Sequence, residues 1–209
     1  MAQTFDSSIS NFPNSYTSLC TVLPSDSLWE SSRSSRPSIL LTSFRTWEAH
    51  QPTNSSDDLL FKLQMQTFYD LQLYYLRHMP VDFELAPQMA IAKLTTLQPD
   101  IILCCGMAES RTRLNVESQA VVSDKTLQTS IQLDDLISGL CMTDISHDAG
   151  TFVCNRLYFD LLNHVKCQDL PSLCLFLHVP ILTAENHRPI VSDVCTIVRR
   201  LANLSQRML

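Results

Sequence analysis

One cysteine of the sequence combines a nucleophilic side chain with a position that can activate it. The turn-forming residues Ala149-Gly-Thr151 lead directly into a helix predicted over residues 152–166, so that Cys154 falls in its first turn. Free backbone N–H groups and the helix dipole favour an anion there and lower the pKa of a thiol. The same N–H groups are placed to stabilise an oxyanion. Cys154 is therefore a candidate nucleophile, although its position also fits an inert, buried helix cysteine.

A nucleophilic thiol needs a base, and His178 is placed to serve as one. It follows the apolar run Leu173–Leu177, which predicts a buried strand, and it stands at the end of that strand. A histidine that reaches the thiol could take its proton. The alternative is a core histidine with no part in chemistry. His147 is a second candidate base because it lies near Cys154 in the sequence, but its position also fits an ordinary loop residue.

The other cysteines form no metal-binding pattern. The sequence has eight cysteines and no CxxC pair. Cys104 and Cys105 are adjacent, and in a strand their side chains would point to opposite faces of the sheet. The N-terminal residues lack the basic start and apolar segment of a secretory signal, which argues against a disulfide framework. We therefore expect no metal and no cofactor, and cysteines that mostly act as small buried hydrophobic residues.

The elements that position these residues alternate along the chain. Apolar runs predict strands, and apolar positions at helical spacing predict helices. We expect residues 115–122 to be extended, whereas residues 124–144 give no clear pattern. The predicted strands cover residues 38–44, 72–76, 100–105 and 173–179, and the predicted helices begin near residue 54 and cover residues 84–97, 152–166 and 190–207. This alternation indicates an α/β fold, a three-layer α/β/α sandwich around a mostly parallel, twisted central sheet.

Sites in such sheets form beyond the carboxyl ends of the strands. Three segments of the sequence are predicted to lie there: Phe44–Thr53 after the first strand, Gly106–Arg113 after the central strand, and His178–Pro180. Because these segments follow neighbouring strands, their side chains are expected to gather at one edge of the sheet.

Composition excludes several classes of protein. The chain has 209 residues, a formal net charge of −6 and three glycines. The acidic balance argues against a nucleic-acid binder, no apolar run reaches the ~20 residues of a membrane helix, and three glycines leave no phosphate-binding loop. We expect a cytoplasmic protein with no membrane partner. It would have a Ser-rich, disordered extension over residues 1–36 and one α/β domain over residues 37–209.

Two segments resemble a known active-site signature. Ala149-Gly-Thr-Phe-Val-Cys-Asn155, followed by His178-Val-Pro180, is similar to the signature of the pyroglutamyl peptidase I family of cysteine peptidases. Ile39–Phe44 resembles the first strand of that family, and Pro99–Ala108 resembles its central strand. The stretch from Ala108 to Ala120 resembles the segment that holds the catalytic glutamate. The resemblance covers about residues 38–205.

The resemblance implies a reaction and a role for each matched residue. Cys154 would be the nucleophile, His178 the base and then the acid for the leaving amine, and Glu117 the acid that orients the imidazole. The enzyme would remove an N-terminal pyroglutamyl residue from a peptide with a blocked N-terminus, through a thioacyl intermediate. Substrate-binding residues on this comparison are Phe44, Trp47, Phe152, Val153 and Arg111.

Departures from the family pattern leave alternatives open. The glycines of the family's A-G-G-R are replaced in Ala108-Glu-Ser-Arg111, and the segment between Glu117 and Cys154 is much shorter than in the family. Glu109 could bind a substrate amine or be an ordinary solvated charge. The alternative function is an altered or inactive relative that binds a ligand or acts on another small amide. A homo-oligomer, which the family often forms, is left open.

Overall fold

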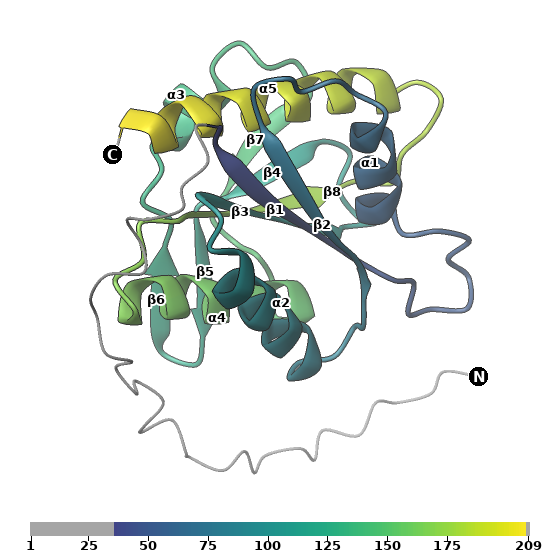
Figure 1. The fold of residues 1–209 in the computed structure, drawn as a ribbon. Coiled ribbons are helices and arrows are strands. Elements are labelled where there is room, and N and C mark those ends of the chain that lie inside the picture. Colours follow the sequence, from purple (N-terminus) through teal and green to yellow (C-terminus); the bar gives the residue numbers. More distant parts are fainter. Residues whose placement is uncertain (1–35, 208–209) are drawn as a thin grey trace, which may run out of the picture.

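The computed structural model describes residues 36–207, so nearly all of the expected Ser-rich extension lies outside the described residues. Strands and helices alternate through most of this part of the chain (Figure 1). The strands are β1 (Ser38–Phe44), β2 (Gln72–Met79), β3 (Ile101–Met107), β4 (Leu114–Glu117), β5 (Gln119–Val122), β6 (Lys125–Gln128), β7 (Thr143–Ser146) and β8 (Leu173–Val179). The helices are α1 (Ser55–Gln64), α2 (Leu85–Leu97), α3 (Leu133–Ile137), α4 (Val153–Cys167) and α5 (His187–Arg207).

The central sheet has six strands in the order β2-β1-β3-β8-β4-β7. Strands β2, β1, β3 and β8 run parallel to one another, whereas β4 runs antiparallel to β8 and pairs in parallel with β7. Every residue of β3 and of β8 is buried, which explains why these strands read as continuous apolar runs. The expected mostly parallel sheet is confirmed, with a reversed pair of strands at one edge.

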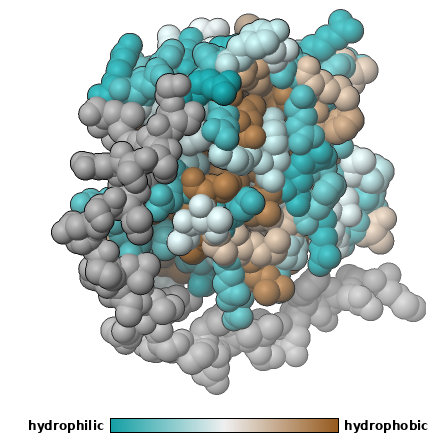
Figure 2. All heavy atoms as spheres, viewed as in Figure 1, coloured by the Kyte–Doolittle hydropathy of each residue, from teal (hydrophilic) through white to brown (hydrophobic). Residues whose placement is uncertain are grey.

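Helices cover both faces of this sheet and complete the three layers (Figure 1). On one face the core is formed with α1, α3 and α5, around residues such as Leu60, Leu103 and Val198. On the other face α2 and α4 form a second core, around residues such as Ala90, Cys104 and Leu157. The β5–β6 hairpin lies beside α4 on this second face (Figure 1). The surface turned to the viewer in Figure 2 is mixed, with hydrophobic patches among hydrophilic residues.

Local sequence explains where the first helix begins. The side chain of Asn54 accepts a hydrogen bond from the backbone N–H of Ser56, and Asp57 and Asp58 follow in the first turn of α1. An amide cap and early carboxylates both satisfy or complement the free N–H groups of a helix start. The segment Asn54-Ser-Ser56 therefore acts as a helix cap.

The stretch without a clear pattern, residues 124–144, contains three short elements: β6, α3 and the start of β7. None of them exceeds five residues, so none repeats a period often enough to be recognised. The expected extended segment 115–122 is divided at Ser118, because β4 belongs to the central sheet and β5 to the separate hairpin.

Among residues 36–207 no disulfide joins two cysteines, and no group of three or more side chains is arranged to hold a metal ion. None of the helices in this part of the chain is long and apolar enough to cross a membrane.

Candidate active site

Cys154 is the second residue of α4, after a tight turn. Gly150 has a φ of +76°, a left-handed conformation that glycine adopts at little cost. Its N–H donates to Asp148 Oδ1 at 2.9 Å. Phe152, at the N-cap position, makes no side-chain cap, so the first N–H groups of α4 are left without a capping side chain. The thiol thus lies at a helix start, as the sequence predicts.

A missing side chain in β3 makes room for this thiol. A Cβ atom placed on Gly106 would lie 2.5 Å from Cys154 Sγ and 2.8 Å from Phe176 Cζ. Such distances are well below van der Waals contact. Glycine at position 106 therefore allows the thiol to rest directly on the sheet.

His178 belongs to the strand next to Gly106. The two residues are register partners in the parallel pair β3–β8, and partners in register place their side chains on the same face, about 4.8 Å apart. The Phe176 ring, two residues earlier on β8, lies 4.9 Å from the imidazole between centroids. Register thus brings the imidazole beside the space that the Cys154 thiol occupies.

Glu117 completes a connected group. Its Oε1 atom lies 2.6 Å from His178 Nδ1, and this contact fits an Nδ1–H that donates to the carboxylate and leaves Nε2 for the thiol. Glu117 is fully buried, His178 is 6% exposed and Cys154 is 8% exposed. Glu117 comes from β4, where its register partner is Phe176. The three residues that the sequence selects are therefore brought to one face of the sheet.

Arg111 lies on the carboxylate of Glu117. Its Nη1 donates to Glu117 Oε1 at 2.6 Å, and its Nη2 donates to the backbone oxygen of Asp148 at 2.8 Å. This places the guanidinium between the acid and the turn that precedes Cys154. The carboxylate of Glu117 has no contact with water, and a buried charge needs an oppositely charged partner. Arg111 is that partner. Contact between Arg111 and a substrate stays a prediction.

The electrostatics of the thiol differ from the prediction. The pKa of the Cys154 thiol is raised to about 12, mainly by burial and to a smaller extent by Cys104 and Glu117. A backbone hydrogen bond and Arg111 lower the pKa, but by less. The expected lowering of the thiol pKa by the helix start is therefore wrong, because desolvation outweighs the helix terminus. Among the described residues, no hydrogen bond joins the thiol to His178.

An aromatic cluster lies next to the nucleophile. The rings of Trp47 and Phe152 are 5.8 Å apart between centroids, and those of Phe83 and Phe152 are 5.7 Å apart and nearly perpendicular. All three side chains are exposed in part, whereas Phe44 and Val153 are each 1% exposed and belong to the core. Whether any of these residues binds a substrate stays a prediction.

Phe83 is absent from the sequence-based selection. It follows β2 and precedes α2, at the same carboxyl edge of the sheet as the other loops. An aromatic residue just beyond a parallel strand is the signal that could have identified it.

The other candidates have local partners. His147 Nδ1 lies 2.7 Å from Ser118 Oγ, and the His147 backbone oxygen accepts a hydrogen bond from Gln119 Nε2 at 2.9 Å. These contacts fit its interpretation as a loop residue.

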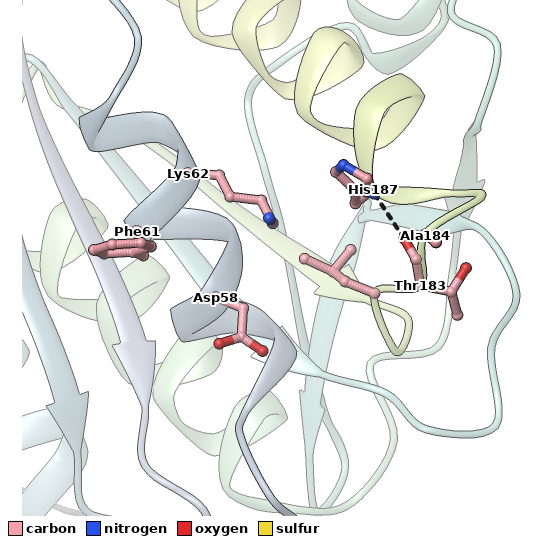
Figure 3. Close-up of a pocket in the computed structure, with 7 residues that line it drawn as sticks. Asp58, Phe61, Lys62, Thr183, Ala184 and His187 are labelled. Atoms are coloured by element: carbon pink, nitrogen blue, oxygen red, sulfur yellow. Dashed lines mark hydrogen bonds between the residues drawn. The ribbon is translucent and has the colours of Figure 1, made fainter.

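Concave surfaces also occur away from these residues. Figure 3 shows a pocket between α1 and the segment that leads into α5, in which His187 Nδ1 lies 2.8 Å from the backbone oxygen of Thr183. Its lining residues are Asp58, Phe61, Lys62, Leu182, Thr183, Ala184 and His187. A second groove lies along β6, the end of α4 and the start of β8. Cys154, His178 and Glu117 line neither of them.

Comparison with known proteins gives one family. A family model described as pyroglutamyl peptidase matches residues 129–189, a range that contains Cys154 and His178 but not Glu117. Pyrrolidone-carboxylate peptidase 1 of Ralstonia nicotianae is 23% identical over 175 residues, which are 71% of this chain and 80% of that protein. A pyrrolidone-carboxylate peptidase of Brachyspira hyodysenteriae is 27% identical over 142 residues, or 56% of this chain and 70% of that protein.

Solved structures show the same fold. Bacillus amyloliquefaciens pyroglutamyl peptidase I has a TM-score of 0.70 and 19% identity, and the match covers 81% of this chain and 98% of that one. A mutant pyrrolidone carboxyl peptidase from the hyperthermophile Pyrococcus furiosus has a TM-score of 0.69 and 19% identity, covering 80% and 98%. The α/β sandwich predicted from the sequence is thus shared with these proteins.

Proposed function

Because this chain is a divergent relative of the pyroglutamyl peptidases, we propose that it is a cysteine peptidase that removes an N-terminal pyroglutamyl residue from a peptide. One observation carries the proposal: the thiol of Cys154 rests on Gly106, beside an imidazole whose Nδ1 is held at 2.6 Å by the buried carboxylate of Glu117. A nucleophile, a base and an orienting acid in this order form the arrangement used for covalent acyl transfer.

In the proposed reaction, His178 Nε2 takes the thiol proton while Cys154 Sγ attacks the carbonyl carbon that joins the pyroglutamyl group to the next residue. The negative oxygen that forms is stabilised by N–H groups at the start of α4. The imidazolium then gives its proton to the leaving amine, and a thioester remains on Cys154. Water, deprotonated by His178, then attacks the thioester carbonyl carbon. The carbon–sulfur bond breaks, pyroglutamate is released, and the imidazolium returns its proton to the thiolate of Cys154.

The raised pKa of the thiol decides how this reaction begins. With a pKa of about 12, Cys154 is neutral at pH 7 in the free protein. In this proposal the proton therefore leaves during attack, by general-base transfer to His178, since the raised pKa disfavours a preformed thiolate–imidazolium pair. Glu117 stabilises the imidazolium, and Arg111 limits the cost of the buried carboxylate.

In this proposal the aromatic cluster of Trp47, Phe83 and Phe152 binds the flat pyroglutamyl ring. Phe152 is the N-cap residue of α4. The Trp47 ring is tilted by 43° to the Phe152 ring, and the Phe83 ring packs edge-on against it. Aromatic faces bind a flat, weakly polar ring by burying its surface. In this proposal they hold the lactam while its exocyclic carbonyl faces Cys154.

The test measures release of a fluorescent amine from a pyroglutamyl amide by the whole chain. We expect hydrolysis that is lost in Cys154→Ala and in His178→Ala, and that persists in Cys141→Ala, which removes an exposed thiol. Loss of His178 should lower kcat by about 10²–10⁴-fold, the usual contribution of a general base. Far-UV and near-UV circular dichroism check that each variant is folded.

Equal rates for Cys154→Ala and the parent protein would contradict the assignment of the nucleophile. A second candidate, a relative that binds blocked N-termini without cleaving them, is favoured by the neutral, buried thiol. Calorimetric binding of a pyroglutamyl dipeptide by a parent protein that shows no hydrolysis would support this second candidate instead.

A further inference from the structure

A carboxylate that departs from the family pattern connects two loops above the site. Glu109 stands where the resembled family has a glycine, in the loop between β3 and β4. Its Oε1 accepts a hydrogen bond from Gln51 Nε2 at 2.6 Å, and its Oε2 lies 3.2 Å from His50 Nε2. Both partners belong to the loop between β1 and α1. Both oxygens of the carboxylate thus have a partner in the neighbouring loop.

The amide of Gln51 also binds the backbone of its own loop. Gln51 is only 9% exposed, and its Oε1 accepts the N–H groups of Trp47 and Glu48 at 3.1 and 3.2 Å. An amide has donors on one side and an acceptor on the other. Because Glu109 takes a donor of Gln51, the amide oxygen is turned toward the two N–H groups that fix the backbone at Trp47.

Trp47 in turn reaches the start of α4. Its ring packs on Phe152, which is the N-cap residue of the helix that carries Cys154. The connection from Glu109 to the aromatic cluster therefore has only two steps, through the Gln51 amide and the Trp47 backbone. This connection holds the β1–α1 loop and the β3–β4 loop together.

From these contacts we propose that Glu109 is a positioning residue that fixes Trp47 through Gln51 and thereby sets the affinity for the pyroglutamyl group. The proposal rests on the proposed function. It also replaces both earlier interpretations of Glu109. A carboxylate with both oxygens engaged is not an unattached solvated charge, and a substrate with a blocked N-terminus offers no amine for it to bind.

The charge of Glu109 strengthens the contact. The hydrogen bonds from His50 and Gln51 lower the pKa of this carboxyl below its ordinary value, so it is ionised at neutral pH. A hydrogen bond that involves an ionised group is stronger than a neutral one. This explains how a partly exposed side chain can orient the loop.

The experiment uses the fluorescence of Trp47 and does not depend on activity. Trp29→Phe leaves Trp47 as the only tryptophan of the chain. In this background we compare the parent with Glu109→Ala, with Glu109→Gln, which keeps an oxygen acceptor for Gln51, and with Asp70→Ala, which removes an exposed carboxylate before β2, at the opposite edge of the sheet. The readouts are acrylamide quenching and anisotropy of Trp47, and kcat and KM for the pyroglutamyl amide.

We expect Glu109→Ala to increase quenching and lower anisotropy, and to raise KM by about fivefold to tenfold with kcat changed much less, since a binding contact is lost. Glu109→Gln should recover part of both effects, and Asp70→Ala should match the parent. Unchanged Trp47 quenching in Glu109→Ala overturns the proposal, and so does changed quenching with an unchanged KM. If the parent protein cleaves no pyroglutamyl amide, the proposed function fails, while the quenching comparison still decides whether Glu109 positions Trp47.

Discussion

At the scale of single residues, Glu117 has two opposing effects on the thiol. Its carboxylate orients and stabilises the imidazole of His178, but the same charge raises the pKa of Cys154. Removing the charge therefore separates two properties that usually change together, the reactivity of the free thiol and the rate of the proposed hydrolysis.

Glu117→Gln should lower kcat by about 10-fold to 100-fold, less than the loss of His178, because an orienting group contributes less than the base. The same substitution should speed alkylation of Cys154 between pH 8 and 10, since loss of a nearby negative charge lowers the pKa of the thiol. Rates of labelling by iodoacetamide, with Cys154→Ala as the blank, measure this. Slower labelling in Glu117→Gln would contradict the electrostatic role of Glu117.

Gly106 is a second residue whose role is defined by contact. Gly106→Ala places a Cβ atom 2.5 Å from Cys154 Sγ. We expect the thiol to be displaced and activity to be lost, with a loss of about 1–3 kcal/mol in the free energy of unfolding, as for overpacked cores.

A double-mutant cycle isolates the contact between Gly106 and the thiol. In the Cys154→Ala background the sulfur is absent, so that Gly106→Ala should cost less, although the contact with Phe176 remains. Equal costs in the two backgrounds, measured by urea unfolding, would show that the sulfur does not meet the new methyl group.

At the scale of elements, α4 is hydrogen-bonded to the backbone of the β5–β6 hairpin through the side chain of Asn155. Asn155 Oδ1 accepts the N–H of Val121 at 2.9 Å, and Asn155 Nδ2 donates to the Val121 backbone oxygen at 2.6 Å. The amide thus satisfies the backbone N–H and C=O of Val121, as a neighbouring strand otherwise would.

Asn155→Ala should lower the free energy of unfolding by about 1–3 kcal/mol, because it leaves two backbone groups of β5 without partners. It should also speed amide exchange in the hairpin before other strands are affected. Asn163→Ala, an exposed residue of the same helix, is the matched control. Hydrogen exchange in β5 that is the same in both variants would argue against this anchoring.

The bounds of buried strands could be predicted from the sequence, but the direction of a short strand could not. Strands β1 and β8 have the bounds that their apolar runs predict, since both are buried and end at loops. The reversal of β4 could not be predicted, because four residues carry no signal of direction.

Some features of the candidate site could likewise be predicted from the sequence, and others could not. Cys154, His178 and Glu117 were identified from residue type, position and resemblance. The space above Gly106, the ring of Phe83 and the link from Glu109 to Gln51 join segments far apart in the sequence, and only tertiary packing brings them together.

At the scale of the whole molecule, buried thiols make stability depend on alkaline pH. Burial raises the pKa of Cys104 and of Cys154 to about 12, and raises those of Cys105 and Cys174 well above the ordinary value. In the unfolded chain a thiol loses its proton near pH 8.5. Above that pH the folded state keeps protons that the unfolded state releases, so the free energy of unfolding must fall as pH rises.

We expect full stability below about pH 8.5 and a loss of about 1.4 kcal/mol per pH unit for each such thiol above it. Urea unfolding between pH 7 and 10 under reducing conditions measures the slope. Cys174→Ala should reduce the slope, and Cys141→Ala, at an exposed position, should not. A stability that stays constant to pH 10 would be inconsistent with these buried neutral thiols.

The position of β8 in the sheet has a consequence for how the protein is made. β8 is the last strand of the described residues, yet it lies between β3 and β4. Until it is inserted, the β2-β1-β3 half and the β4–β7 half share no backbone hydrogen bonds in the sheet. Pairings so distant in sequence form late in folding. A nascent chain that already holds its thiol, its acid and its glycine would therefore have no assembled site. If the proposed function holds, cleavage would begin only after β8 has paired with both β3 and β4.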